Sequence, residues 1–245
     1  MCTTNSPRYR LARHVHACRS GHFIVLLDLR HDRYLGLQPE ALPVLRHRVS
    51  GIDAMFPDGR KNASMDDAQL TSEGVVALEQ LISGGILVPT DAIEGSETKV
   101  PIEPPVEGLS DEYEPLEVSV RVRDVVRFLY AVAYASFLLR YRPLEETLES
   151  VRRISRGADT FQAAKAKRLM NLFDRLRTLA YTAHNKCLFN SLAAKRFLAF
   201  YGIHPRFVMG VATDPFKAHC WLQRGTIVVN DRSYLVQEYS PILAI

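Results

Sequence analysis

The chain has 245 residues, of which 47% are hydrophobic and 24% charged, a composition that predicts one large or two small folded domains. Its four cysteines show no Cys-x-x-Cys spacing and its first 20 residues hold no uninterrupted apolar run, so we expect reduced thiols in a cytoplasmic protein. The longest apolar run, over residues 125–139, is shorter than the roughly 20 residues that a bilayer requires, so we expect no membrane span.

The net charge of +4 is unevenly distributed along the chain. Residues 91–117 hold one lysine against nine carboxylates (net −8) and contain four prolines, a composition that disfavours regular structure. We therefore predict an acidic, proline-rich linker at 91–117 between a domain at 1–90 and a basic domain at 118–245. Residues 65–85 hold no lysine or arginine, so we expect no nucleic-acid partner.

In the N-terminal domain the sequence predicts three strands followed by three helices, typical of a small winged-helix-like fold. The strands are expected at 9–20, 22–30 and 33–38. The helices are expected at 39–49, 65–70 and 71–83, the last capped by Thr71 or Ser72 and ended by Gly84-Gly85. His14, His16 and Cys18 alternate on the first strand, but no fourth ligand accompanies them, so we expect no metal.

In the C-terminal domain the pattern predicts helices followed by an antiparallel sheet, an α+β arrangement. The helices are expected at about 120–140, 144–154, 160–183 and 187–202. The strands are expected at 206–213, 218–223 and 226–231.

Cys187 stands at the start of the fourth of these helices, where unpaired backbone N–H groups favour a thiolate. His219 lies early in one strand and Asp231 ends the next, with the turn at Arg224-Gly225 midway between them. We therefore expect the two side chains to face each other across the hairpin, about 5 Å apart. This arrangement predicts a nucleophile, a base and an orienting carboxylate, although ordinary structural roles for the three residues remain an alternative.

The motifs CLFNSLAAKRFLAFYGI (187–203) and FVMGVATDPFKAHCWLQRGTIVVND (207–231) together resemble the C-terminal domain of lasso-peptide B proteins. These are a branch of the transglutaminase-like cysteine peptidases, related in fold to papain. The resemblance implies catalytic roles for Cys187, His219 and Asp231 and no cofactor. Cys220 departs from the alanine that such proteins more often carry; we expect it to point away from His219, and we interpret it as packing.

Other residues near these motifs have more than one interpretation. His184 or Asn185 is a candidate lining of the oxyanion pocket or a plain loop residue, and the backbone N–H of Cys187 is a candidate oxyanion donor. Trp221 shares a strand face with His219, where it either shields the site from water or packs in the core.

The first 90 residues resemble the leader-recognition domain related to the small chaperone of pyrroloquinoline quinone synthesis. The resemblance implies that a leader peptide adds as a strand to the third strand and packs beside the last helix. The residues so implicated are Tyr34, Leu35, Gly36, Leu37, Val75, Leu78, Glu79 and Ile82. Of the two leucines at 35 and 37, we expect one to face the groove and the other the core.

Together the two resemblances imply a cysteine peptidase that binds a ribosomally synthesised lasso precursor peptide through its leader. It would hydrolyse the leader–core bond and free the core for macrocyclisation by a cyclase partner. Transglutaminase-type acyl transfer to an amine uses the same three residues and remains an alternative. A non-catalytic scaffold that only binds the leader is the third.

Overall fold

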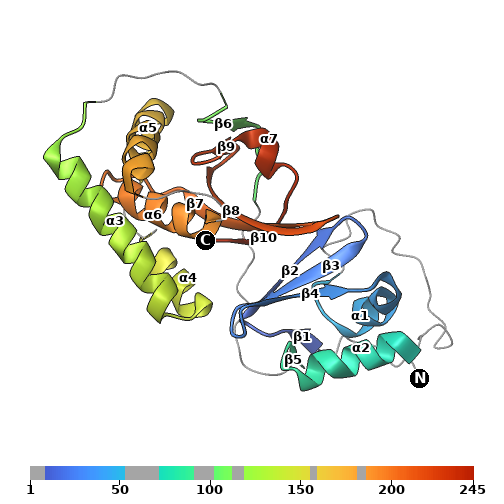
Figure 1. Ribbon diagram of the computed structural model, residues 1–245. Coiled ribbons are helices and arrows are strands. Elements are labelled where there is room, and N and C mark those ends of the chain that lie inside the picture. Colours follow the sequence, from blue (N-terminus) through green and yellow to red (C-terminus); the bar gives the residue numbers. More distant parts are fainter. Residues whose placement is uncertain (1–8, 53–71, 91–101, 112–118, 155–158, 181–185) are drawn as a thin grey trace. The chain divides into compact units, whose positions relative to one another are not determined.

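The computed structural model describes residues 9–52, 72–90, 102–111, 119–154, 159–180 and 186–245. The chain divides into two compact units, residues 1–99 and 100–245. Both contain helices and strands, so the protein is of mixed α/β class; Figure 1 labels these elements.

The N-terminal unit contains a three-stranded antiparallel meander in the order β2-β3-β4. Its strands are β2 (Val15–Ser20), β3 (Phe23–Asp28) and β4 (Arg33–Leu37). The expected first strand over 9–20 is wrong in its extent, because the Val15 N–H donates to the Ala12 carbonyl and the chain turns there. This turn also removes His14 from the strand that carries His16 and Cys18. The residues before the turn pair instead with a distant strand: β1 (Tyr9–Leu11) pairs with β5 (Leu87–Pro89).

Two α-helices belong to the described part of this unit. They are α1 (Leu42–Arg48), which follows the 3-10 turn η1 (Pro39–Ala41), and α2 (Ser72–Ser83). As expected, α2 ends at the glycine pair, where Gly85 adopts a positive φ of 66° that favours glycine. The helix expected over 65–70 lies outside the described residues, so the winged-helix-like arrangement stays an expectation.

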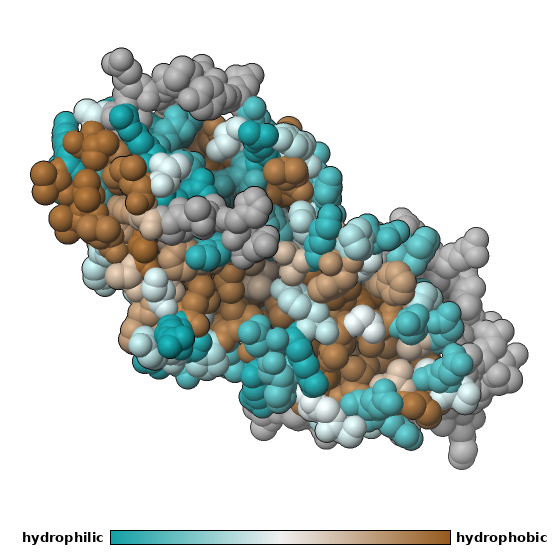
Figure 2. Space-filling model, in the orientation of Figure 1, coloured by the Kyte–Doolittle hydropathy of each residue, from teal (hydrophilic) through white to brown (hydrophobic). Residues whose placement is uncertain are grey.

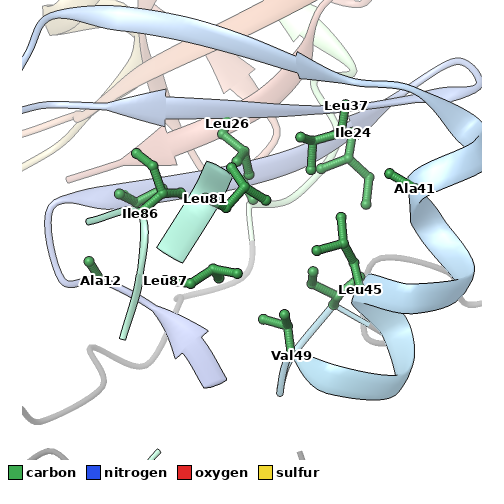
Figure 3. Packing of buried hydrophobic residues seen from close by; sticks show 13 residues of the cluster. Ala12, Ile24, Leu26, Leu37, Ala41, Leu45, Val49, Leu81, Ile86 and Leu87 are labelled. Carbon is green, nitrogen blue, oxygen red and sulfur yellow. The ribbon is translucent and has the colours of Figure 1, made fainter. Parts of the chain in front are cut away.

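The core of the N-terminal unit is an aliphatic cluster between the sheet and the helices. Figure 3 shows the side chains of Ile24 and Leu26 of β3 in one cluster with Leu45 of α1 and Leu81 of α2. Side chains two apart in a strand share a face, so β3 supplies alternate residues to this cluster. Burial of such aliphatic side chains is the main favourable contribution to folding here.

The C-terminal unit contains a five-stranded sheet in the order β10-β7-β8-β9-β6. Its strands are β6 (Glu107–Gly108), β7 (Arg206–Thr213), β8 (Phe216–Arg224), β9 (Ile227–Val228) and β10 (Ser240–Ala244), with α7 (Ser233–Val236) before the last. β7 and β8 match the expected strands closely. The strand expected over 226–231 is much shorter, because its pairing with β8 ends at Val228.

Within the described residues, four helices lie between β6 and β7, close to the expected positions. They are α3 (Val122–Tyr141), α4 (Leu144–Ile154), α5 (Ala163–Ala180) and α6 (Cys187–Ala199). α6 contacts α3 as well as β8. Its Phe197 ring lies 5.6 Å from Phe173 of α5, which in turn packs edge-on against Phe128 of α3 at 5.4 Å. The contacts with α3, α5 and β8 hold α6 in place, and they therefore fix the position of Cys187 at its start.

The outward face of α3 is partly apolar. Val122, Val126 and Leu129 are 81%, 59% and 54% exposed, and Figure 2 shows brown surface over the N-terminal part of this helix. Within the described residues, none of the helices combines the length and apolar character of a membrane span.

The expected linker over 91–117 is wrong for its described part, residues 102–111, which is hydrogen-bonded into the C-terminal unit. β6 pairs in parallel with β9, and the Gln223 amide donates to the Glu103 carbonyl at 2.6 Å. The Leu109 N–H donates to the Val228 carbonyl at 2.9 Å. The composition predicted an extended chain without regular structure. The backbone is indeed extended, but it forms hydrogen bonds with the edge of the sheet, as an added strand does.

Candidate active site

Cys187 is the first residue of α6 and is half-buried. The N–H groups of a helix's first turn have no acceptor within the helix and carry partial positive charge. That charge stabilises a thiolate over a thiol. Because the Cys187 N–H itself belongs to this turn, it remains a candidate oxyanion donor. His184 and Asn185 lie outside the described residues.

His219 of β8 and Asp231 are joined by a short hydrogen bond, with 2.6 Å between the imidazole Nε2 and the carboxylate Oδ2. The other oxygen of Asp231 accepts the Arg232 N–H at 2.8 Å. Nδ1 is then the imidazole nitrogen left for the thiol, so the carboxylate selects both the tautomer and the ring orientation.

The route by which Asp231 reaches His219 differs from the expected hairpin pairing. Regular pairing of β8 with β9 ends at Gln223 opposite Val228. Beyond it, the Asn230 side chain accepts the Leu222 N–H at 2.6 Å in place of a backbone acceptor. The chain thus leaves the sheet before Asp231, whose carboxylate meets the imidazole from a loop.

Cys187 completes the arrangement. Its sulfur is hydrogen-bonded to Cys220, which has the larger effect on its pKa, and also to His219. These contacts outweigh burial and lower the pKa of the Cys187 thiol to about 4. For His219, burial alone would lower the pKa, but the hydrogen bonds to Asp231 and Cys187 raise it to about 9. The two residues therefore form a thiolate–imidazolium pair across the neutral pH range.

Cys220 does not play the simple packing role expected from its alternation with His219. Its thiol and its backbone N–H both hydrogen-bond the Cys187 sulfur. The reason is the position of α6, whose Ser191 hydroxyl donates to the Cys220 carbonyl at 2.9 Å and brings the helix against this strand position. The contact with Cys187, together with burial, raises the pKa of the Cys220 thiol well above its usual value, so this thiol stays protonated and donates.

Aromatic rings enclose the imidazole. Trp221 is fully buried and stacks near His219 with 6.2 Å between ring centroids, while Tyr239 lies 5.1 Å away. Trp221 is thus a core residue that packs beside the imidazole. Gly210 of β7 pairs with His219, and a Cβ added there would lie 2.7 Å from the Trp221 ring. Only glycine leaves room for this ring beside the imidazole.

Ser191 and Asn230 link the helix that carries Cys187 to the loop that carries Asp231, and neither was predicted from the sequence. The Asn230 amide donates to the Ser191 hydroxyl at 3.0 Å, and that hydroxyl donates onward to the Cys220 carbonyl. The network joins α6, which carries Cys187, to the loop that carries Asp231. The Cys-x-x-x-Ser spacing was the available signal, because it puts both residues on one helix face.

Asp111 anchors the same loop from outside the sheet and was also missed. One carboxylate oxygen accepts the Ser233 N–H at 2.8 Å, and the other accepts the Ser233 hydroxyl and the Gly108 N–H, each at 2.6 Å. Partial burial would raise the pKa of this carboxyl, but the hydrogen bonds, led by those from Ser233, lower it. Asp111 therefore holds the chain two residues beyond Asp231.

An open pocket of about 550 Å³ gives access to the Cys187–His219 pair. Lys186 and Lys217 contribute to its lining together with Cys187, His219 and Asp231. In the described part of the chain, no cluster of three or more histidine, cysteine or acidic side chains is arranged to hold a metal ion. A substrate carbonyl in this pocket would meet a thiolate, an acid and the helix N–H groups.

The residues implicated in leader binding lie in the N-terminal unit. Leu35 and Leu37 share one face of β4 and pack on the same core cluster, so the expectation that they face opposite ways is wrong. Leu78 and Ile82 of α2 also pack against this cluster. The remaining four are more exposed: Tyr34 is half-buried, and Gly36, Val75 and Glu79 are exposed.

The thiolate–imidazolium pair predicts the pH dependence of Cys187 alkylation by iodoacetamide. With a pKa of about 4 for Cys187 and about 9 for His219, the rate should be nearly constant between these values. An unperturbed thiol, with a pKa of about 8.5, would lose about tenfold in rate for each pH unit below it. Asp231→Asn should narrow the pH range over which the alkylation rate is constant (the alkylation plateau), because an amide does not stabilise the imidazolium. Subtracting the signal of Cys187→Ala isolates this thiol, and a steady decline in rate from pH 8 downward would contradict the ion pair.

Asp111→Asn should narrow the same alkylation plateau by about one pH unit. Without the hydrogen bonds to Ser233, the loop before α7 is held less firmly, and the contact between Asp231 and His219 weakens. An amide presents an NH₂ group where the carboxylate accepts hydrogen bonds from three donors. Glu107→Gln is the matched control, since it makes the same change at an exposed position of the same segment. Identical profiles for the two variants, with unchanged thermal unfolding, would show that Asp111 does not position the site.

Comparison with known proteins finds a family match for the C-terminal region. Residues 128–244 match the family Transglut_core3, described as the transglutaminase-like superfamily. No curated protein and no solved structure matches the chain. The matched range includes Cys187, His219 and Asp231, whereas Asp111 lies outside it. The C-terminal unit therefore carries a transglutaminase-like superfamily domain over residues 128–244.

Proposed function

We propose that the protein is a cysteine peptidase that binds a ribosomally synthesised lasso precursor peptide through its leader and hydrolyses the leader–core bond. The observation that carries this proposal is the arrangement of Cys187 and His219 in one pocket, with the His219 Nε2 2.6 Å from the Asp231 carboxylate. The superfamily match supports thiol-based acyl chemistry. The lasso substrate is supported by the motifs around Cys187 and His219 and by the strand edge of the N-terminal unit.

The proposed reaction proceeds through a thioester. The Cys187 thiolate attacks the carbonyl carbon of the leader–core amide, and helix N–H groups stabilise the developing oxyanion. The amide C–N bond then breaks, and the imidazolium of His219 gives its proton to the leaving amine. Neutral His219 takes a proton from water as the hydroxide attacks the thioester carbonyl. The C–S bond then breaks, Cys187 is released as a thiolate, and the leader leaves as a carboxylic acid that ionises in solvent. Asp231 holds the imidazole through both stages.

Leader binding is supported by the form of the N-terminal unit. β4 is an edge strand, which within the described residues pairs only with β3. An extended peptide can add to such an edge through backbone hydrogen bonds, with side-chain pockets providing selectivity. The turn before β4 is ordered by fully buried Asp28, which accepts hydrogen bonds from His31 at 2.7 Å and from Arg33 at 3.2 Å. The edge is therefore presented in a defined conformation.

The exposed flank of α2 supplies the second wall of the proposed leader site. Helical geometry puts Val75 and Glu79 beside the core-packed Leu78 and Ile82, whereas Val76 lies on the side away from the core cluster. Val75 is 37% exposed and Val76 51%. A leader strand on β4 would thus meet apolar and acidic groups from α2. Cleavage then frees the amine of the core peptide, which we assign as the nucleophile for a separate cyclase.

The catalytic proposal predicts that Cys187→Ala abolishes precursor cleavage while the protein still binds the leader. Without a thiolate no thioester forms, but the N-terminal unit is unchanged. Mass analysis of products and fluorescence anisotropy of a labelled leader provide the two readouts. Cleavage at a rate comparable to wild type would put the nucleophile elsewhere. A product joined to an added amine, in place of two hydrolysed fragments, would favour acyl transfer.

The leader-site proposal predicts a contrast between two adjacent substitutions on α2. Val75→Asp should weaken leader binding about tenfold, which corresponds to the loss of one buried valine contact. Val76→Asp introduces the same charge about 100° further round the helix, on the side away from the core cluster, and should leave affinity close to wild type. Anisotropy titrations measure both, and circular dichroism checks folding. Equal effects of the two substitutions would show that this flank of α2 does not select the leader.

A further inference from the structure

Cys220 stabilises the Cys187 thiolate but takes no covalent part in the proposed reaction. That reaction uses one thiolate, one imidazole and one carboxylate, yet a second cysteine donates its S–H to the nucleophile's sulfur. Both residues contribute to the lining of one pocket and both are free thiols. Two sulfur atoms in contact, one of them a thiolate, are the starting arrangement for an intramolecular disulfide.

The two thiols differ in solvent access, as a pair made of an oxidised cysteine and a resolving cysteine requires. Cys187 is half-buried and lines an open pocket, so a small oxidant reaches its sulfur from solvent. Cys220 is 5% exposed, and its carbonyl is held by the Ser191 hydroxyl at 2.9 Å. Cys220 is thus less accessible to an oxidant than Cys187, and it is held beside the atom that is attacked. One cysteine suits the role of the oxidised residue and the other the role of its resolving partner.

We propose that Cys187 and Cys220 form a peroxide-reactive pair, in which Cys187 is oxidised first and Cys220 then closes a reversible disulfide. In the first step the Cys187 thiolate attacks one oxygen of hydrogen peroxide and the O–O bond breaks. The departing hydroxide takes the proton of the His219 imidazolium and leaves as water, so that Cys187 becomes a sulfenic acid. The thiolate has lost two electrons and the peroxide has gained them.

In the second step the Cys220 sulfur attacks the sulfenic sulfur of Cys187. The S–O bond breaks as the S–S bond forms, and the hydroxide leaves with the Cys220 proton as a second water. Overall, two thiols and one peroxide give one disulfide and two waters. A sulfenic acid without a nearby thiol is instead open to further peroxide and reaches the sulfinic acid, which thiols do not reduce. Cys220 therefore protects the nucleophile while switching it off.

Any effect of the disulfide on activity rests on the proposed function, but its formation is a property of the two thiols alone. The test therefore measures thiols rather than turnover. The reduced full-length protein is treated with hydrogen peroxide, and remaining thiols are alkylated. Peptide mass analysis should find a Cys187–Cys220 crosslink with loss of two hydrogens. Dithiothreitol should then restore alkylation of Cys187 to nearly its level before treatment.

Cys220→Ala removes the resolving thiol and should convert the response from reversible to irreversible. After peroxide and then dithiothreitol, its Cys187 alkylation should be about tenfold lower than in wild type, with sulfinic acid found at this position. Cys18→Ala is the control: Cys18 is also buried, but it lies in the N-terminal unit, so this variant should behave as wild type. Wild-type protein that forms no Cys187–Cys220 crosslink and accumulates sulfinic acid like Cys220→Ala would overturn the proposal. A chain that forms the crosslink but cleaves no precursor would contradict only the peptidase function.

Discussion

The candidate site depends on one electrostatic constraint, the charge separation between the Cys187 sulfur and the His219 imidazole. Burial disfavours both charges, so the pair exists only because each charge has further partners. The thiolate has the start of α6 and hydrogen bonds from residue 220, and the imidazolium has the Asp231 carboxylate at 2.6 Å. The pKa of the thiol falls and that of the imidazole rises, so their charged forms coexist near neutrality. Removing any one of these partners returns the remaining charge to an unfavourable environment.

The surrounding structure can be understood as the means of holding these partners in place. Three elements distant in sequence meet at this site: the start of α6, the middle of β8 and the loop after β9. Ser191 connects the first two, since its hydroxyl contacts the Cys220 carbonyl at 2.9 Å, and Asn230 connects this network to the loop. Asp111 fixes the other end of the loop through Ser233. Segment 102–111 therefore contributes to holding the candidate site although it precedes the residues that match the superfamily.

The parts of this structure that the sequence predicted are those governed by local patterns. Helical periodicity and glycine stops located α2 and the four helices that end with α6, and apolar runs located β7 and β8. Local patterns did not reveal β6 or Asp111, because an acidic, proline-rich composition carries no information about a sheet edge that accepts it. The contact of Cys220 with Cys187 was missed for a related reason. Strand alternation tells which face a side chain occupies, but the docking of α6 against the strand is a tertiary property. The position of Asp231 likewise depends on Asn230, whose side chain replaces a backbone partner.

The most direct test of the account is the ultraviolet absorbance of the thiolate, recorded as a difference between wild type and Cys187→Ala across pH. This measurement needs no substrate and no reagent, so it reports the ground state of the pair itself. The account predicts that one thiolate per chain is present at pH 6 and disappears only as the pH approaches the Cys187 pKa of about 4. A difference spectrum without thiolate absorbance until the pH exceeds about 8, the behaviour of an unperturbed cysteine, would contradict it.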